Sequence, residues 1–254
     1  MNNKCKILVL SDVDKSTKEI LKKGVDLAKV IDAEIDFFCV KKPTDVVAKE
    51  SQLSAMRSIN KKFIETDNQI KKMIDDVSIK NNIKISHKIS FGNLKDEISN
   101  QLKETKPDIV LLGKRKPKVF SFLGDNIIDF LLKEFSGTIL IVSEENLLEV
   151  NEEISIGLLN NVNLSSNKFM ETLVSYSKKP LKSFQIDVKS AEEKVLIPKD
   201  TIKYVFEDGD NAIKNMSSYL TKNNINLLFL NREKNTNSKV ANWVRSINCS
   251  LMLS

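Results

Sequence analysis

The sequence is poor in the residues that build metal centres, disulfide frameworks and catalytic pairs. Its 254 residues include three cysteines and one histidine. The cysteines are far apart, their number is odd and no C-x-x-C spacing occurs, so we expect buried free thiols in a reducing compartment, with no metal site. No H-E-x-x-H, G-x-S-x-G or intact Walker loop is present, and the lone His87 lies between isoleucines, which favours a structural role. We therefore predict no catalytic residues.

Aromatic residues and long apolar runs are also scarce. Aromatics make up 6% of the chain, which argues against a platform for stacking bases. The net charge of +6 is spread over both halves, so no basic arm points to a nucleic-acid partner. No apolar run approaches the ~18 residues of a membrane span, and the short run after the N-terminus ends at Ser11-Asp12, unlike a signal peptide. We expect a cytoplasmic protein that binds neither nucleic acid nor membrane.

What is present is an alternation of apolar strand-like runs with segments of helical spacing. This order predicts β-α-β units, which form parallel sheets with right-handed crossovers. The polar stretch 46–82 carries spaced apolar residues and is compatible with one long helix or two shorter ones. The predicted strands are 6–10, 34–40, 83–89, 109–112 and 138–142.

The same order of elements begins again after an acidic segment near residue 150. Strands are predicted at 154–159, 184–188, 202–206, 226–230 and 250–253. A repeat of this size indicates duplication of a whole α/β domain. We therefore predict two Rossmann-like domains, residues 1–145 and 152–254, each with a mostly parallel five-stranded sheet flanked by helices.

The stretch from Pro107 to Ser143 carries the clearest functional pattern. An apolar strand ends at Leu112-Gly113, a basic loop follows, and Gly124-Asp125 opens an amphipathic helix that leads to a last strand. Loops between a strand's carboxyl end and a helix N-terminus are where α/β sheets bind anions. The loop therefore either cradles an anion or is a solvated loop, and its Phe120 and Phe122 pack onto the sheet or onto a partner.

With these residues the first domain resembles the universal stress protein family, which has an adenine nucleotide alpha hydrolase-like fold. The family's phosphate loop is G-x-x-G-x9-G-[S/T]. Gly113 matches its first glycine and Gly124 its third, while Lys116 stands at the second and Asp125 at the hydroxyl residue. The resemblance implies a tandem universal stress protein whose two last strands pair, giving an internal pseudo-dimer.

The resemblance also implies a ligand, an adenine nucleotide such as ATP or AMP, in the first domain. The aspartate that lies by the adenosine in family members corresponds to Asp12, which from the residues alone could equally cap the first helix. The second domain has Asn231 where the first has its glycine, and we expect no nucleotide there. The implied nucleotide-binding positions are Leu10, Asp12, Val40, Leu112, Gly113, Lys116, Gly124 and Asp125.

Three functions follow as competing hypotheses. The first is a stress-response protein that acts by binding a ligand or partner, with a nucleotide in the first domain. The second is an interaction or dimerisation module that binds an unidentified protein and no nucleotide. The third is a weak ATPase, for which Asp125 is the local candidate to hold a metal ion. Tandem chains could also pair further into homodimers.

Overall fold

The first half of the chain folds as the alternating pattern predicts. The structure is a computed structural model that describes residues 4–43, 52–114, 125–143, 154–160, 162, 164, 167–178, 180–186, 200–209, 211–232 and 236–254. The described part of the polar stretch forms one long helix, α2. In order, the elements are β1 (Cys5–Leu10), α1 (Thr17–Ile31), β2 (Ala33–Lys41), α2 (Gln52–Asn81), β3 (Ile85–Phe91), α3 (Leu94–Thr105), β4 (Ile109–Gly113), α4 (Asp125–Glu134) and β5 (Thr138–Val142).

The second half repeats this order with shorter elements. Its strands are as apolar as those of the first half, and β6, β9 and β10 are buried along their whole length. The elements are β6 (Ile156–Leu159), α5 (Lys168–Ser175), β7 (Lys182–Ile186), β8 (Ile202–Phe206), α6 (Ala212–Lys222), β9 (Leu227–Leu230), α7 (Asn237–Ser246) and β10 (Ser250–Leu253).

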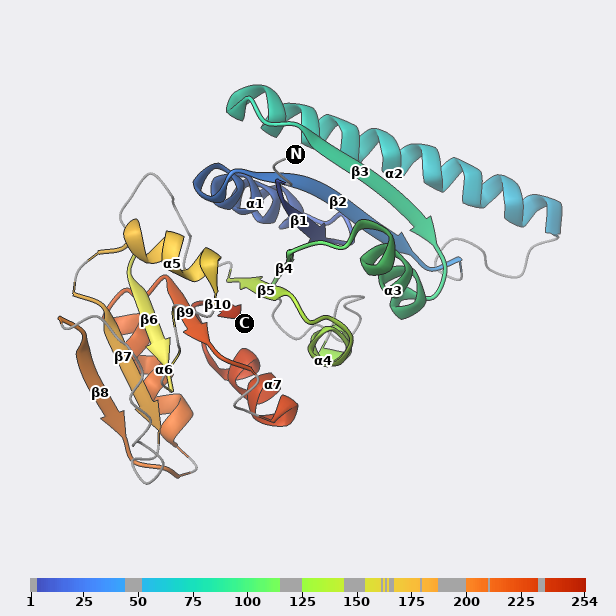
Figure 1. The fold of residues 1–254 in the computed structure, drawn as a ribbon. Coiled ribbons are helices and arrows are strands. Elements are labelled where there is room, and N and C mark those ends of the chain that lie inside the picture. Colours follow the sequence, from blue (N-terminus) through green and yellow to red (C-terminus); the bar gives the residue numbers. More distant parts are fainter. Residues whose placement is uncertain are drawn as a thin grey trace.

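The two halves share one ten-stranded sheet, in the order β3-β2-β1-β4-β5-β10-β9-β6-β7-β8 (Figure 1). Strands within each half are parallel, and the two last strands meet at the centre as an antiparallel pair. In that pair Ile141 lies opposite Leu251 and Leu140 opposite Met252. Both last strands are completely buried. Each would be an exposed apolar edge in a separate half, and the pairing covers both edges. The predicted α/β fold with a pseudo-dimeric arrangement is thus confirmed.

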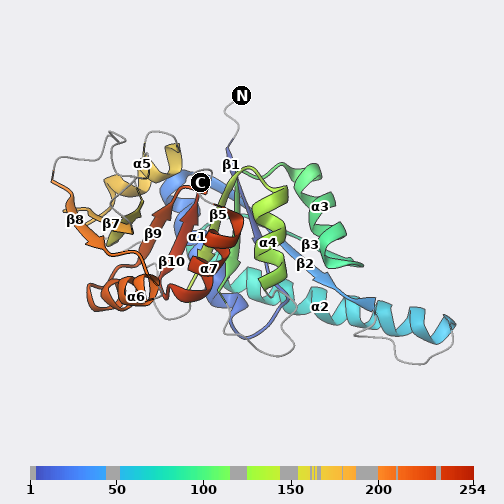
Figure 2. The same cartoon turned by 90° about the horizontal axis from the view of Figure 1, so that it is seen from below.

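Helices cover both faces of the sheet, and each face has a core that runs through both halves (Figure 2). One core gathers buried residues of α1, α2 and α5, including Leu21, Ile70 and Met170. The other gathers those of α3, α4, α6 and α7, including Ile98 and Trp243. Because each core contains residues of both halves, the halves stabilise each other.

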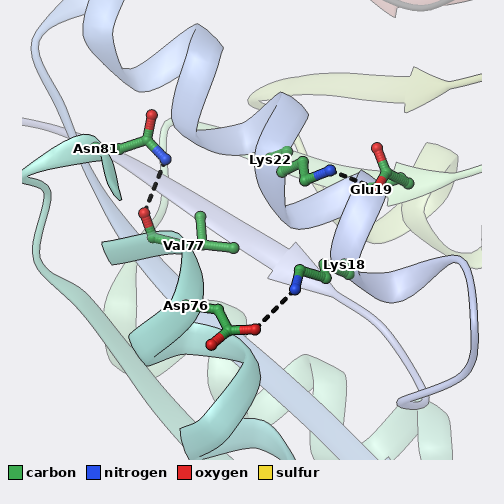
Figure 3. Close-up of polar contacts among 6 residues, drawn as sticks. All are labelled: Lys18, Glu19, Lys22, Asp76, Val77 and Asn81. Carbon is green, nitrogen blue, oxygen red and sulfur yellow. Dashed lines mark hydrogen bonds and ion pairs between the residues drawn. The ribbon is translucent and has the colours of Figure 1, made fainter. Parts of the chain in front are cut away.

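Helix α2 is fixed to the rest of the molecule through its C-terminal half. Figure 3 shows Lys18 of α1 reaching Asp76, with 2.7 Å between Nζ and Oδ2, and Asn81 donating to the carbonyl of Val77. One turn further, Lys29 Nζ donates to the Asn81 side chain at 2.7 Å. Neither α2 nor any other helix in the described part of the chain is long and apolar enough to cross a membrane.

Candidate functional site

The nucleotide positions implied by the resemblance meet at the carboxyl ends of β1, β2 and β4. In the first half the chain order reverses between β1 and β4, which is where open α/β sheets form ligand crevices. Leu10 pairs with Phe38 of β2 on one side and with Leu112 of β4 on the other. Leu10, Asp12 and Val40 line one cavity together with Ser11, Phe38, Leu94 and Ile98. The structure therefore brings the predicted residues of these strands together.

This cavity is too small for a nucleotide. Its volume is about 10 Å³, roughly the minimum that a single water molecule needs. Ile98 of α3 packs across the strand ends, and its side chain is 1% exposed, while those of Leu10 and Phe38 are each 2% exposed. Among the described residues, apolar side chains therefore close most of the space at the ends of β1 and β2.

The backbone of Asp12 contacts the end of β2. Its carbonyl accepts a hydrogen bond from Lys41 Nζ at the end of β2. The carboxylate at the start of α1 belongs to Asp14, whose Oδ1 accepts from the backbone N–H of Ser16 at 2.9 Å and from its hydroxyl at 2.7 Å. Ser16 is the N-cap residue of α1 and makes no capping hydrogen bond through its side chain, and Asp14 closes the turn before the helix. Burial raises the pKa of the nearby Cys39 thiol to about 11, so this cysteine is a neutral part of the core.

Gly113 has a packing reason to be glycine. A Cβ at this position would lie 2.3 Å from Cδ1 of Ile20, so only a residue without a side chain lets α1 approach β4 this closely. The glycine that the resemblance assigned to a phosphate loop therefore also serves the packing of Ile20 against the end of β4. The next residue, Lys114, donates from its Nζ to the carbonyl of Ile247 in the second half. Its charge therefore lies at the C-terminal end of α7, which a cation stabilises.

The other residues of the predicted phosphate loop lie outside the described part of the chain. These are Lys116, Gly124, Phe120 and Phe122, and for Asp125, the first residue of α4, the structure describes only the backbone. Among the described residues no group of three histidine, cysteine or carboxylate side chains could hold a metal ion. His87 lies on β3 with its Nε2 2.7 Å from Oδ1 of Asp67, which ties the strand to α2.

A second and much larger cavity, which the sequence analysis did not predict, lies between the two halves. Its volume is about 810 Å³. Its lining residues come from both halves and are far apart in the sequence, so no local pattern points to this cavity. The wall is lined by Ser99, Leu102, Lys103, Lys106, Pro107, Asp108, Glu134, Phe135, Ser136, Gly137, Thr138, Asn167, Phe169, Asn231 and Ser254.

The two halves hold each other across this cavity. Nη2 of Arg232 donates to the carbonyl of Gly137 at 2.7 Å, and the Asn167 amide donates to the hydroxyl of Thr138 at 2.9 Å. Arg232 after β9 thus mirrors Lys114 after β4, since each reaches a carbonyl just before the last strand of the other half. The charges of Lys103 and Lys106 in the wall are balanced by those of Asp108 and Glu134. The wall therefore has no excess positive charge to attract an anion.

Comparisons with known proteins show which family the sequence matches and which solved structures have a similar fold. The sequence profile of the Universal stress protein family matches residues 5–143. A universal stress protein from Archaeoglobus fulgidus DSM 4304 is similar in structure over 98% of this chain and 97% of its own, with a TM-score of 0.68 and 12% identity. A putative universal stress protein from Pseudomonas aeruginosa UCBPP-PA14 covers 99% and 93%, with a TM-score of 0.57 and 8% identity. No curated protein matches the sequence.

Proposed function

Because the chain belongs to the universal stress protein family, in tandem form, we propose that it is a stress-response protein of the cytoplasm that acts by binding a protein partner. In this proposal neither turnover nor a bound nucleotide is needed for its action. The sheet and its two shared cores serve as a rigid support that presents a binding surface.

One observation carries this proposal. At the ends of β1 and β2, where the resemblance puts the adenosine, the described residues leave a cavity of about 10 Å³, lined by Leu10, Phe38, Val40 and Ile98 together with Ser11, Asp12 and Leu94. To admit a nucleotide, α3 would have to move away from the strand ends and expose Ile98 and Leu10. Separating Ile98 from Leu10 and Phe38 would break buried apolar contacts, and this cost would weaken the binding of any nucleotide.

Two neighbouring features support the same conclusion. The glycine at 113 serves the packing of α1, and the charge of Lys114 is directed at the second half of the molecule. Both residues are therefore used by the fold itself.

Thermal unfolding of the full chain with millimolar ATP, ADP or AMP and magnesium tests the proposal. We expect the unfolding midpoint to stay unchanged with each nucleotide. A ligand at about 100 times its dissociation constant would stabilise the native state by roughly 2.7 kcal/mol, which raises the midpoint by several degrees. A rise that disappears in Asp12→Ala would refute the proposal, because it would place a working nucleotide site in the first half.

That refuting outcome corresponds to a second candidate function, binding of an adenine nucleotide in the first half. The observation in its favour is that Leu10, Asp12 and Val40 line one cavity at the carboxyl ends of the strands, where the chain order reverses between β1 and β4. It predicts that Leu94→Ala, which removes part of the cavity's cover, strengthens nucleotide binding. Equal midpoints of Leu94→Ala with and without nucleotide would count against it.

A further inference from the structure

Helix α2 is much longer than the strand it covers. Its 30 residues span roughly 45 Å, whereas the seven residues of β3 span roughly 23 Å. Figures 1 and 2 both show the N-terminal part of α2 projecting beyond the end of the sheet. We call residues 52–65 the overhang. From Leu53 to Glu65 no side chain is buried, whereas Thr66, Ile70 and Val77 are all buried against the first half.

The apolar seam of α2 continues along the overhang, where its side chains are largely exposed among the described residues and Phe63 contacts the ring of Phe91, with 6.3 Å between the ring centroids. Residues spaced alternately three and four apart form the seam, which is the pattern of a coiled-coil face. They are Met56, Ile59, Phe63, Thr66, Ile70, Met73 and Val77. The side chain of Met56 is 58% exposed, that of Phe63 41%, and that of the adjacent Leu53 74%. Four of the eight large apolar side chains exposed in the described residues lie between Leu53 and Ile64, and such a gathering marks an interaction surface.

The overhang also carries a net positive charge. Arg57, Lys61 and Lys62 lie on it, and no acidic residue occurs between Gln52 and Ile64. Helix N-termini carry a positive partial charge that acidic residues in the first turn usually offset, and here the first turn has none. The nearest carboxylate, Glu65 at the end of the overhang, lies 3.8 Å from Lys62. The potential around the exposed seam is therefore positive.

We propose that the overhang binds an acidic amphipathic helix of a protein partner, which lays its apolar face along Leu53, Met56 and Phe63. This inference rests on the proposed function, for which it names the binding surface. Glutamate and aspartate beside the partner's apolar face would meet the three cations and the helix N-terminus. A second copy of this chain fits less well, because pairing two overhangs brings like charges together.

Two synthetic helical peptides of about 18 residues test this proposal. Both carry the same leucine seam, and the flanking positions are glutamate in one and lysine in the other. Titration of the full chain into labelled peptide, followed by fluorescence anisotropy, should show binding of the glutamate peptide. We expect the lysine peptide to bind at least about tenfold more weakly, and added salt to narrow the difference.

Variants locate the binding on the helix. The double substitution Leu53→Ser with Met56→Ser should abolish binding, and Arg57→Glu with Lys61→Glu should reverse the preference in favour of the lysine peptide. Ile79→Ser is the matched control: Ile79 is 83% exposed on the same helix but lies outside the overhang, and its loss should change nothing. Circular dichroism and the unfolding midpoint should be unchanged in all three, since these side chains pack on nothing in the folded core.

Four outcomes would overturn the proposal. They are equal binding of the two peptides, binding of neither, binding of phosphatidylglycerol vesicles instead of peptide, and a dimer in light scattering that Leu53→Ser with Met56→Ser dissociates. The last two would assign the overhang to a membrane surface or to a second copy. A nucleotide-dependent shift in the unfolding midpoint would refute the proposed function and leave the peptide result untouched, so the two failures are distinguishable.

Discussion

The pairing of β5 with β10 makes a quantitative prediction about how the two halves depend on each other. Ile141 and Leu251 lie opposite each other in this pair and are 0% and 1% exposed. Replacing either by alanine removes buried methyl groups and leaves a cavity, which should destabilise the protein by about 2–5 kcal/mol. A loss of about 3 kcal/mol should lower the unfolding midpoint by roughly 6–12 °C in a chain of this size.

Because the two residues are neighbours, their substitutions should not be additive. The double variant Ile141→Ala with Leu251→Ala should differ from the sum of the single effects by about 0.5–3 kcal/mol. Leu8→Ala provides the control, since Leu8 lies on β1 in the same core but three strand spacings, roughly 14 Å, from β10. Leu8→Ala with Leu251→Ala should be additive within about 0.5 kcal/mol.

Urea denaturation followed by two probes provides the measurement. Far-ultraviolet circular dichroism reports on both halves, whereas the fluorescence of Trp243, the single tryptophan, reports on the buried face of α7 in the second half. We expect the two signals to change together in the wild type, because both cores run through both halves. An additive Ile141–Leu251 cycle, or a tryptophan transition separate from that of circular dichroism, would refute a shared sheet.

Three further perturbations test particular contacts. Gly113→Ala places a Cβ 2.3 Å from Ile20 and should cost about 1–3 kcal/mol in urea denaturation, whereas Gly209→Ala, with nothing within 4 Å, should change little. Arg232→Met removes the hydrogen bond to the first half and should cost about 1–3 kcal/mol, and an unchanged midpoint would show that this contact does not stabilise the junction. Hydrogen bonds from its lysine and histidine neighbours hold the pKa of Asp67 below its usual 3.8. A group with a lowered pKa stabilises the fold above its unfolded value, so the advantage of the wild type over Asp67→Asn should be full near neutral pH and shrink as the pH falls through 3.8 and below. A thermal-melt series in which the advantage grows on acidification would contradict this assignment.

Much of the fold could be predicted from the sequence because it is encoded in short-range patterns. Runs such as Ile109–Leu112 are apolar at every position, as strands buried on both faces must be, and they alternate with helical spacing in both halves. The duplication followed from the same patterns, whereas the pairing of the two last strands was implied by the family resemblance. The gathering of Leu10, Asp12 and Val40 was likewise predictable, because the carboxyl ends of neighbouring parallel strands meet at one edge.

What the site contains depended on contacts between residues far apart in the sequence. The closing of the cavity depends on how α3 places Ile98 over the strand ends, and no local pattern specifies that position. The carbonyl that accepts the hydrogen bond of Lys114 belongs to Ile247, which is 133 residues away in the other half of the molecule. Choosing between Asp12 and Asp14 as the carboxylate at the start of α1 required the backbone geometry of a single turn.

Helix α2 shows most clearly where sequence information ends. Its periodic apolar residues determined that a helix forms and which of its faces is apolar, because a period near 3.6 residues is a property of the helix alone. Which part of that face is buried depended on the length of β3 and on where Ile70, Ile74 and Val77 pack into the core. Met56 and Val77 belong to the same seam, and only the tertiary structure decided that one is exposed while the other lies in the core, since burial depends on what the folded chain places beside each residue.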